Sequence, residues 1–544
     1  MAADEGAARA TGEAAAASGA AVGEAAAPAP GPRAATVRQL IEQQARTQPD
    51  SIYAVSTAGE TLTYRQLAAS CRAVAHKLDA LGSGPGAHVS LVMPNGIGTL
   101  SLLLGALHGG RCVNPVNLLS QPAQMRYVLE HADADIVLVA PDWVERVREM
   151  VAALPRPLQV VEVDPDAPFP PLDGDGEGAL APGSEHVSPD SLALLMYTSG
   201  TTGLPKGVML TQANLAASAH AISAEHGLAA HDRVHAVLPL FHINAFAVTM
   251  LAPLAHGGSL LMAPKFSAAA FWQQAVEHRC TWINVVPTII SYLLEGAAPP
   301  QDDLRNIRFC RSASAALPPE HHRAFERKFG IGIVETMGLT ETVAPSFSNP
   351  MQPAERRLGS VGRASGCEAR VAGADGRTLS DGQTGEILLR GPQVMKGYYK
   401  NDAATRAAFH ADGWLRTGDL GHRDGDGFFF VTGRIKELII KGGENIAPRE
   451  IDEALLGHPA VLEAAAVGIP DRHYGQEIMA CVVLREGRSC SENEMREYCL
   501  DVLGRYKTPR VIRFVAELPR GPSGKVQRLK LTDLLDGEAA SAGE

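Results

Sequence analysis

The chain has 544 residues, of which 45% are hydrophobic and 20% charged, and its formal net charge is −11. This length exceeds one compact core and predicts several folding units of an ordinary globular protein. The acidic balance argues against nucleic acid as a partner, because phosphate backbones are bound by basic surfaces. Eight cysteines without a CxxC pair favour reduced thiols in a cytoplasmic protein, and no apolar run is long enough to span a bilayer.

The chain begins with a low-complexity tract of Ala, Gly, Glu and Pro over residues 1–36, which we interpret as a disordered tail. From residue 37, helical stretches at 65–81 and 123–131 alternate with short apolar runs at 88–92 and 136–139. This alternation predicts an α/β fold with parallel strands.

A second α/β block is predicted from residue 191 to residue 345, and the Gly-rich stretch 357–431 predicts a small β-rich subdomain. After residue 433 the pattern resets, with strands expected at 437–441 and 464–467 and helices at 449–457 and 492–503. The sequence therefore predicts a large N-terminal domain (37–433) of two α/β subdomains plus the β-rich one. A separate small α+β C-terminal domain (434–535) and a tail (536–544) follow.

The most informative segment is residues 197–207, which read Tyr-Thr-Ser-Gly-Thr-Thr-Gly-Leu-Pro-Lys-Gly. It follows an apolar strand predicted at 191–196 and precedes a helix expected at 210–220. Small residues let backbone N–H groups approach an anion, hydroxyls add donors, and Lys206 adds a positive charge. Because Pro205 and Gly207 flank the lysine, the Walker spacing does not fit. We predict a triphosphate-binding loop of another kind rather than a Gly/Thr-rich surface turn.

Two further motifs suit the rest of a nucleotide. In residues 335–342, Glu-Thr-Met-Gly-Leu-Thr-Glu-Thr, the hydroxyl of Thr340 and the carboxylate of Glu341 suit a phosphate oxygen and Mg²⁺. In residues 413–420, Gly-Trp-Leu-Arg-Thr-Gly-Asp-Leu, Asp419 suits two ribose hydroxyls. Taken alone, the motif at 335–342 could instead be a polar helix start, and Asp419 in the motif at 413–420 could be an Asp in a turn.

Two other motifs suit movement. Residues 433–446 combine glycines with Arg434 and Lys436 at the predicted domain boundary, which is typical of a hinge. Lys525 lies in the Pro/Gly-rich stretch 519–528, and a lysine on a mobile loop brings its charge to a reacting centre only when the loop closes. A solvated surface lysine is the alternative.

Together the five motifs resemble the adenylate-forming superfamily, which includes acyl-CoA synthetases, aryl-CoA ligases, firefly luciferase and peptide-synthetase adenylation domains. The resemblance covers residues 37–533. It implies an AMP-forming carboxylate–CoA ligase, in which ATP and Mg²⁺ adenylate a carboxylic acid. The C-terminal domain then rotates about Lys436, and the thiol of coenzyme A forms the thioester. A free-standing enzyme that loads an acyl carrier protein is the alternative. A luciferase-type oxygenase and a catalytically inactive nucleotide-binding protein are less favoured alternatives.

The resemblance also implies roles for single residues. Lys525 would contact the carboxylate and α-phosphate, Thr340 the α-phosphate, and Glu341 with Thr201 the Mg²⁺. His242 would gate the acyl pocket around residues 239–246 and 337–343, and a histidine that only bonds a backbone carbonyl is the alternative. The nucleotide and CoA contacts would come from Thr198, Ser199, Gly200, Thr201, Thr202, Gly203, Lys206, Ser314, Ala315, Ala316, Met337, Asp419, Arg434, Gly442 and Gly443.

The acid is less well determined. Met337 departs from the aromatic residue that often stacks on adenine, although a thioether also packs on a ring. Asn244 could donate to a polar substituent of the acid, whereas Phe246 and Val248 would favour an apolar chain. We expect a fatty or a small organic acid, and the sequence leaves its chain length, its polarity and the oligomeric state open.

Overall fold

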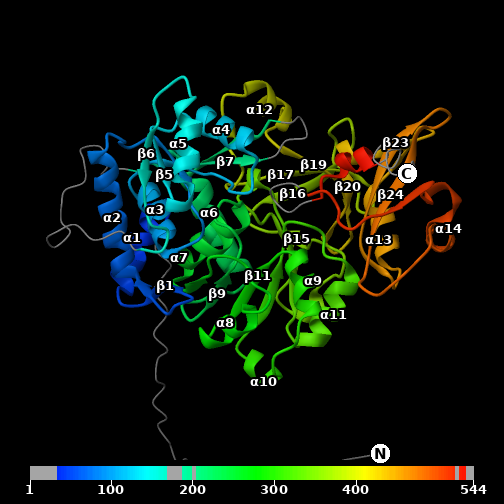
Figure 1. Ribbon diagram of the computed structural model, residues 1–544, viewed down its shortest axis with the longest axis horizontal. Coiled ribbons are helices and arrows are strands. Elements are labelled where there is room, and N and C mark those ends of the chain that lie inside the picture. Colours follow the sequence, from blue (N-terminus) through cyan, green and yellow to red (C-terminus); the bar gives the residue numbers. More distant parts are fainter. Residues whose placement is uncertain (1–33, 168–186, 199–203, 521–525, 535–544) are drawn as a thin grey trace, which may run out of the picture. The chain divides into compact units, whose positions relative to one another are not determined.

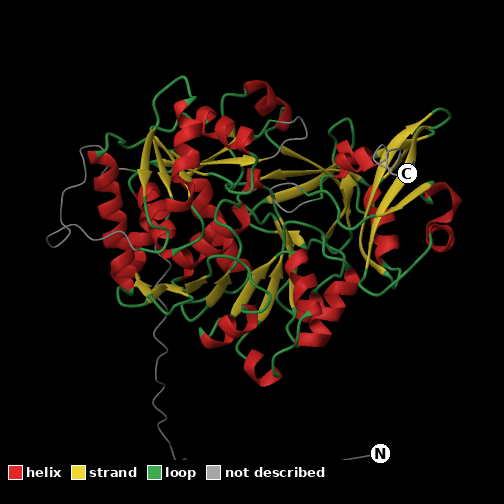
Figure 2. Cartoon of the chain, in the orientation of Figure 1, coloured by secondary structure: helices red, strands yellow, loops and turns green. Residues whose placement is uncertain are grey.

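The computed structural model describes residues 34–167, 187–198, 204–520 and 526–534 (Figures 1 and 2). Within these ranges the strands form four sheets. The largest runs in the order β15-β14-β13-β12-β11-β9-β10-β1-β2, with parallel pairing from β1 through β13. Its strands are β1 (Ile52–Ser56), β2 (Thr61–Thr63), β9 (Arg233–Ala236), β10 (Ser259–Met262), β11 (Trp282–Val285), β12 (Phe309–Ser312), β13 (Ile333–Met337), β14 (Phe347–Ser348) and β15 (Arg363–Ala364).

The second sheet has the order β18-β8-β7-β4-β3-β5-β6, and the strands from β7 to β6 are parallel. Its strands are β3 (His88–Val92), β4 (Cys112–Pro115), β5 (Ile136–Val139), β6 (Gln159–Glu162), β7 (Leu192–Thr198), β8 (Lys206–Thr211) and β18 (Gly397–Tyr398). The parallel α/β prediction is confirmed, and β3 and β5 begin and end where the apolar runs predicted.

Two smaller sheets follow along the chain. The antiparallel β-rich subdomain consists of β16 (Glu368–Ala372), β17 (Gly385–Arg390), β19 (Leu415–Arg423) and β20 (Phe429–Arg434). The C-terminal sheet consists of β21 (Ile439–Lys441), β22 (Glu444–Ile446), β23 (Val461–Asp471), β24 (Gly475–Leu484) and β25 (Val511–Phe514).

The α-helices of the described ranges accompany these sheets, and none combines the length and apolarity needed to cross a membrane. Those labelled α1 to α7 are α1 (Val37–Thr47), α2 (Tyr64–Ala80), α3 (Ile97–His108), α4 (Pro122–His131), α5 (Val144–Ala152), α6 (Gln212–Glu225) and α7 (Ala252–His256). Those labelled α8 to α14 are α8 (Phe271–Glu277), α9 (Pro287–Glu295), α10 (Gln301–Leu304), α11 (Pro319–Phe329), α12 (Asp402–Ala408), α13 (Pro448–Leu456) and α14 (Glu492–Lys507).

Two details of the predicted organisation are wrong. The α/β blocks are not consecutive, because β1 and β2 pair into the sheet of β9 to β13, and β7 and β8 pair into the sheet of β3 to β6. Such pairing depends on contacts between distant strands, which local periodicity does not report. The helix expected from residue 210 begins at Gln212, because Lys206–Thr211 forms β8 and Thr211 caps the helix with Asn214.

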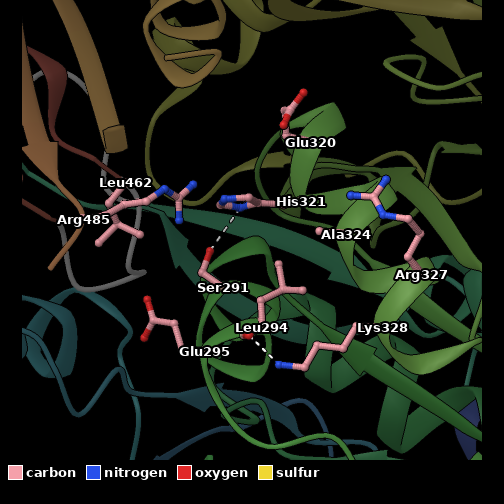
Figure 3. A pocket seen from close by; sticks show the side chains of 10 residues that line it. All are labelled: Ser291, Leu294, Glu295, Glu320, His321, Ala324, Arg327, Lys328, Leu462 and Arg485. Atoms are coloured by element: carbon pink, nitrogen blue, oxygen red, sulfur yellow. Dashed lines mark hydrogen bonds between the residues drawn. The ribbon is translucent and has the colours of Figure 1, made fainter. Parts of the chain in front are cut away.

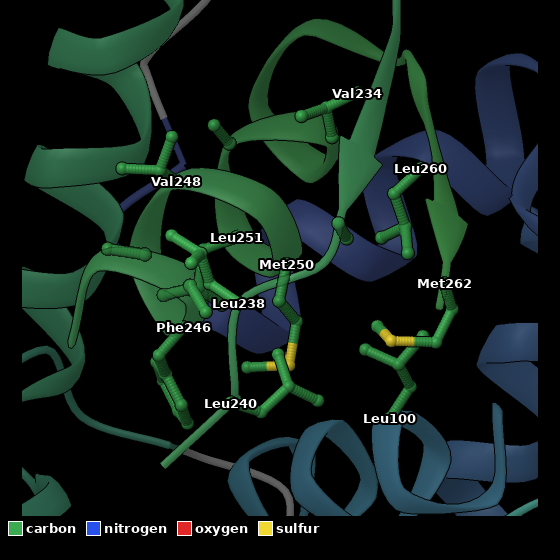
Figure 4. Close-up of a cluster of buried hydrophobic side chains, with 14 of the residues drawn as sticks. Leu100, Val234, Leu238, Leu240, Phe246, Val248, Met250, Leu251, Leu260 and Met262 are labelled. Atoms are coloured by element: carbon green, nitrogen blue, oxygen red, sulfur yellow. The ribbon is translucent and has the colours of Figure 1, made fainter. Parts of the chain in front are cut away.

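The hydrophobic core that packs against the largest sheet includes a π-helix, η2 (Asn244–Leu251). This helix begins within the predicted acyl segment. Figure 4 shows Phe246, Met250 and Leu251 of this helix among Leu238, Leu260 and other buried side chains. Phe246 and Val248 have 0% exposure. Their burial fixes the helix in place, and the helix in turn positions Asn244 at its first residue.

Candidate active site

The phosphate-loop prediction falls on a β-hairpin. β7 and β8 pair antiparallel, and the last pair in register is Thr198 with Lys206. The two residues therefore flank the connection that the sequence marks as the anion loop. Ser199, Gly200, Thr201, Thr202 and Gly203 lie outside the described residues, so their predicted roles stay predictions.

Lys206 and Glu341 meet through a residue that the sequence analysis missed. The Nζ of Lys206 lies 5.1 Å from the ring centroid of Tyr398, and the Tyr398 hydroxyl donates to Oε1 of Glu341 at 2.8 Å. Burial, and secondarily the Glu341 carboxylate, raises the pKa of Tyr398, so its hydroxyl remains a donor at neutral pH. The lysine of the predicted phosphate loop and the predicted Mg²⁺ carboxylate thus belong to one cluster.

Glu341 is held in a tight turn after β13. Thr340 and Glu341 lie in the 3₁₀ helix η3 (Thr340–Thr342), which Gly338 and Leu339 connect to the end of β13 at Met337. A Cβ at Gly338 would come within 2.7 Å of the Cα of Ala344, so the backbone passes there only because the residue is glycine. The backbone N–H of Met395 donates to the Glu341 carbonyl at 2.8 Å, which fixes the turn against the segment before Tyr398.

The predicted adenine segment, Ser314 to Ala316, follows β12. Ser314 has a φ of 75°, which is uncommon for a residue other than glycine. Its Oγ accepts from Nδ2 of Asn244 at 3.2 Å, so the predicted adenine and acyl segments touch. His242 lies two residues before Asn244, with its ring 4.8 Å from that of Phe241.

Below this segment lies a buried carboxyl. The backbone N–H of Leu317 donates to Oε1 of Glu335 at 3.3 Å. Burial raises the pKa of Glu335 to about 7. The first glutamate of the motif at 335–342 thus supports the loop from within, whereas Glu341 lies at the partly exposed end.

The predicted ribose carboxylate is paired with a cation. Asp419 on β19 stands opposite Arg434 on β20, and Oδ1 of Asp419 lies 2.8 Å from Nε of Arg434. The Asp419 side chain is only 3% exposed, and its backbone N–H donates to Oγ1 of Thr417 at 3.0 Å. This support fixes the carboxylate, which is what the binding of two vicinal hydroxyls needs. Lys436 follows in the 3₁₀ helix η5 (Ile435–Glu437).

The predicted CoA-side glycines form a turn in the C-terminal sheet. Gly442 and Gly443 have φ values of 57° and 88° and connect β21 to β22. The N–H of Gly442 donates to the carbonyl of Tyr474, and the preceding Lys441 pairs with Glu477 at 2.5 Å. These contacts, which cover described residues only, do not join the turn to the cluster of Lys206, Tyr398 and Glu341. Lys525 lies outside the described residues.

The donor set fits the nucleotide and the metal that the motifs imply. Within the described ranges no group of three or more His, Cys, Asp and Glu side chains forms a metal site. Mg²⁺ does not need one, because it is held by one or two carboxylates together with the phosphates of a nucleotide. Glu341 beside Lys206 matches that arrangement.

A cavity of about 480 Å³ lies elsewhere. Its lining residues, labelled in Figure 3, come largely from α9 and α11. Among the described residues that line it, none is a predicted site residue. The His321 ring meets the Ser291 hydroxyl there at 3.3 Å. The candidate active site is therefore defined by its polar clusters and not by this cavity.

Sequence comparison identifies the class of protein that this site defines. Residues 41–399 match the AMP-binding enzyme family, and residues 450–525 match the AMP-binding enzyme C-terminal domain. The chain belongs to the AMP-binding enzyme family and is an AMP-forming acid–CoA ligase.

Three known proteins illustrate the similarity. The sulfoacetate–CoA ligase of Cupriavidus necator is 57% identical over 91% of this chain and 97% of its own length. The oxalate–CoA ligase of Arabidopsis thaliana is 34% identical over 91% of this chain and 97% of its own. The o-succinylbenzoate–CoA synthetase of Bacillus subtilis, solved with ATP and a magnesium ion, has a TM-score of 0.78 at 28% identity, covering 91% of this chain and 99% of the other.

Proposed function

We propose that this ligase activates a small organic acid with a second acidic group, and that its substrate is sulfoacetate. The observation that carries the proposal is the 57% identity, over nearly the whole chain, to a sulfoacetate–CoA ligase. The oxalate and o-succinylbenzoate enzymes act on acids that also carry two acidic groups. Of the two acid classes that the sequence left open, this favours the small organic acid over the fatty acid.

The first half-reaction joins two anions. An oxygen of the acid's carboxylate attacks the α-phosphorus of ATP, the bond to the β-phosphate breaks, and pyrophosphate leaves. Lys206 and Lys525 offset the repulsion and stabilise the charge that develops in the transition state. Glu341 and Thr201 would hold Mg²⁺, which would neutralise phosphate charge. Asp419, oriented by Arg434, holds the ribose, and the backbone at Ser314, Ala315 and Ala316 lies along the adenine.

The second half-reaction releases AMP. The sulfur of coenzyme A attacks the acyl carbon, the thiol proton is lost, and the bond from that carbon to the AMP oxygen breaks. We propose that the domain 434–535 turns about Lys436 relative to the domain 37–433. This movement withdraws Lys525 and brings the turn of Gly442 and Gly443 to the acyl-adenylate.

Two further expectations from the sequence stay predictions. They are the disordered tails at 1–36 and 536–544 and the cytoplasmic location.

Pyrophosphate release with ATP and Mg²⁺ tests the proposal, with a panel of acids and with or without coenzyme A. We expect turnover that requires coenzyme A and is greatest with sulfoacetate. Greater turnover with a fatty or aromatic acid would refute the proposed substrate. Turnover that does not depend on coenzyme A but does depend on an acyl carrier protein would refute the proposed acceptor.

A further inference from the structure

Among the described residues, one buried cation without an ion-pair partner lies in the largest sheet. Arg311 is on β12 between β11 and β13, and its side chain is fully buried. Its Nη1 donates to Oδ1 of Asn244 and to Oδ1 of Asn284, both at 2.8 Å. Asn284 stands opposite Arg311 in the register of β11 and β12. Two neutral amide oxygens are thus the hydrogen-bond acceptors of this guanidinium in the described part of the chain.

The remaining edge of the guanidinium has no partner among the described residues. Within the same ranges Nε and Nη2 of Arg311 are buried without a hydrogen bond, and no carboxylate forms an ion pair with Arg311. Burial lowers the pKa of Arg311 to about 9, so it still carries its charge at neutral pH. A buried charge without a counter-ion is strongly unfavourable. Nε–H and Nη2–H point from the same edge and form the fork that binds two oxygens of one acid group.

The contacts of Nη1 place the Arg311 guanidinium beside the segments predicted to bind the acid and the nucleotide. Asn244 accepts from Arg311 and also donates to Ser314, so one amide joins the arginine to the predicted adenine segment. Asn244 lies two residues after His242, in the predicted acyl segment. Through Nη1 the guanidinium therefore lies one residue, Asn244, away from the predicted adenine segment and in contact with the predicted acyl segment.

We propose that Arg311 binds the second acidic group of the acid substrate through its Nε–Nη2 edge. This inference rests on the proposed function, and the group is a sulfonate or a carboxylate. The substrate would supply the missing counter-ion, and its other acid group would remain for the α-phosphate. An acid with a single charge would leave the buried cation unpaired, and sites built around buried polar groups reject analogues that lack the partner by factors of about 10⁴–10⁵.

The test compares acids of matched size in wild type, Arg311→Met and Arg311→Lys. We would measure kcat/KM in pyrophosphate release for sulfoacetate, malonate, propionate and acetate, together with the KM for ATP and the melting temperature. Arg308→Met is the matched control, because Arg308 immediately precedes the same strand but is paired with Asp232 at 2.8 Å.

We expect Arg311→Met to lower kcat/KM for the preferred two-acid substrate by about 10²-fold or more, while propionate turnover is unchanged or raised. Its melting temperature should not fall, because Met removes an uncompensated buried charge. Arg311→Lys should retain part of the preference, since it keeps the charge but loses the fork. Arg308→Met should leave the ratio of sulfoacetate to propionate turnover unchanged.

The outcomes separate this inference from the proposed substrate. If wild type is most active with malonate and Arg311→Met loses the preference for malonate over propionate, the inference stands and the sulfoacetate assignment fails. If wild type is most active with sulfoacetate and Arg311→Met keeps the preference for sulfoacetate over propionate, the assignment stands and the inference is overturned. An equal loss with all four acids, accompanied by a lower melting temperature, would show a structural role and also overturn the inference.

Discussion

Removing the hydroxyl of Tyr398 tests the link between Lys206, the proposed phosphate-loop lysine, and Glu341, the proposed metal-binding carboxylate. Tyr398→Phe deletes the 2.8 Å hydrogen bond to Glu341 but keeps the ring beneath Lys206. A hydrogen bond to a charged group contributes about 1.5–3 kcal/mol. Because Glu341 is partly exposed, water recovers some of this, and we expect a loss of about 1–2 kcal/mol.

That loss corresponds to a decrease in adenylation of about 5- to 30-fold, since each 1.4 kcal/mol is tenfold. The assay is exchange of pyrophosphate into ATP across a range of Mg²⁺ concentrations. Because the lost bond orients the carboxylate of Glu341, which we propose binds the metal, the half-saturating Mg²⁺ concentration should rise. The KM for the acid should change less than twofold.

The neighbouring tyrosine offers a matched control. The Tyr399 hydroxyl also donates to a carboxylate at 2.8 Å, but the acceptor is Asp133. Tyr399→Phe removes the same kind of bond outside the cluster and should leave the Mg²⁺ dependence of exchange unchanged. Two results would refute the reasoning: exchange by Tyr398→Phe within twofold of wild type at limiting Mg²⁺, or an equal shift in Tyr399→Phe.

Three further predictions concern other parts of the site. Lys525→Ala should lower adenylation by about 10²–10³-fold but affect thioester formation from preformed acyl-adenylate much less, and equal losses in the two half-reactions would contradict domain alternation. Because burial raises the pKa of Glu335 from 4.5 to about 7, the folded state binds this proton more tightly, and the free energy of unfolding should fall by up to about 3 kcal/mol as the pH rises through that interval. Glu335→Gln should remove this part of the slope in urea unfolding between about pH 4.5 and 8, and an unchanged slope would exclude it. Gly338→Ala should reduce stability by about 1–3 kcal/mol, because its Cβ would collide with Ala344, and an unchanged melting temperature would show that the turn relaxes.

The sequence predicted the local elements well where apolar runs are bounded by turn residues. β3 and β5 coincide with the predicted strands, and α2 (Tyr64–Ala80) lies within one residue of the predicted helix at each end. The start of α6 was missed, although Thr211 with Asn214 is a recognisable capping pair. The exchange of strands between the two large sheets left no local signal, since it depends on pairs such as Val113 with Leu194 and Ala54 with Leu260, which lie 81 and 206 residues apart.

The candidate site divides in the same way. Lys206, Glu341 and Asp419 lie in dense motifs of glycine, hydroxyl and charged residues, which single them out. Tyr398 contacts Glu341 across 57 residues from a strand of two residues, and a lone tyrosine has no pattern. The sequence analysis did not single out Arg311, and only the structure shows that it is buried and that no carboxylate among the described residues pairs with it.

Tyr398 and Arg311, the two residues that the sequence did not predict, differ in the free-energy cost of burying their polar groups. This difference indicates a functional role for Arg311. Tyr398 is satisfied, because its hydroxyl has an acceptor and its ring has a cation. Arg311 is not, and an apolar residue of similar volume would stabilise the same strand better. The Nη1 hydrogen bonds of Arg311 to Asn244 and Asn284 leave Nε and Nη2 without acceptors among the described residues, so folding alone does not account for this half of the guanidinium. A ligand with a complementary charge does, and the relatives that act on sulfoacetate and oxalate show that such acids occur among substrates of this family.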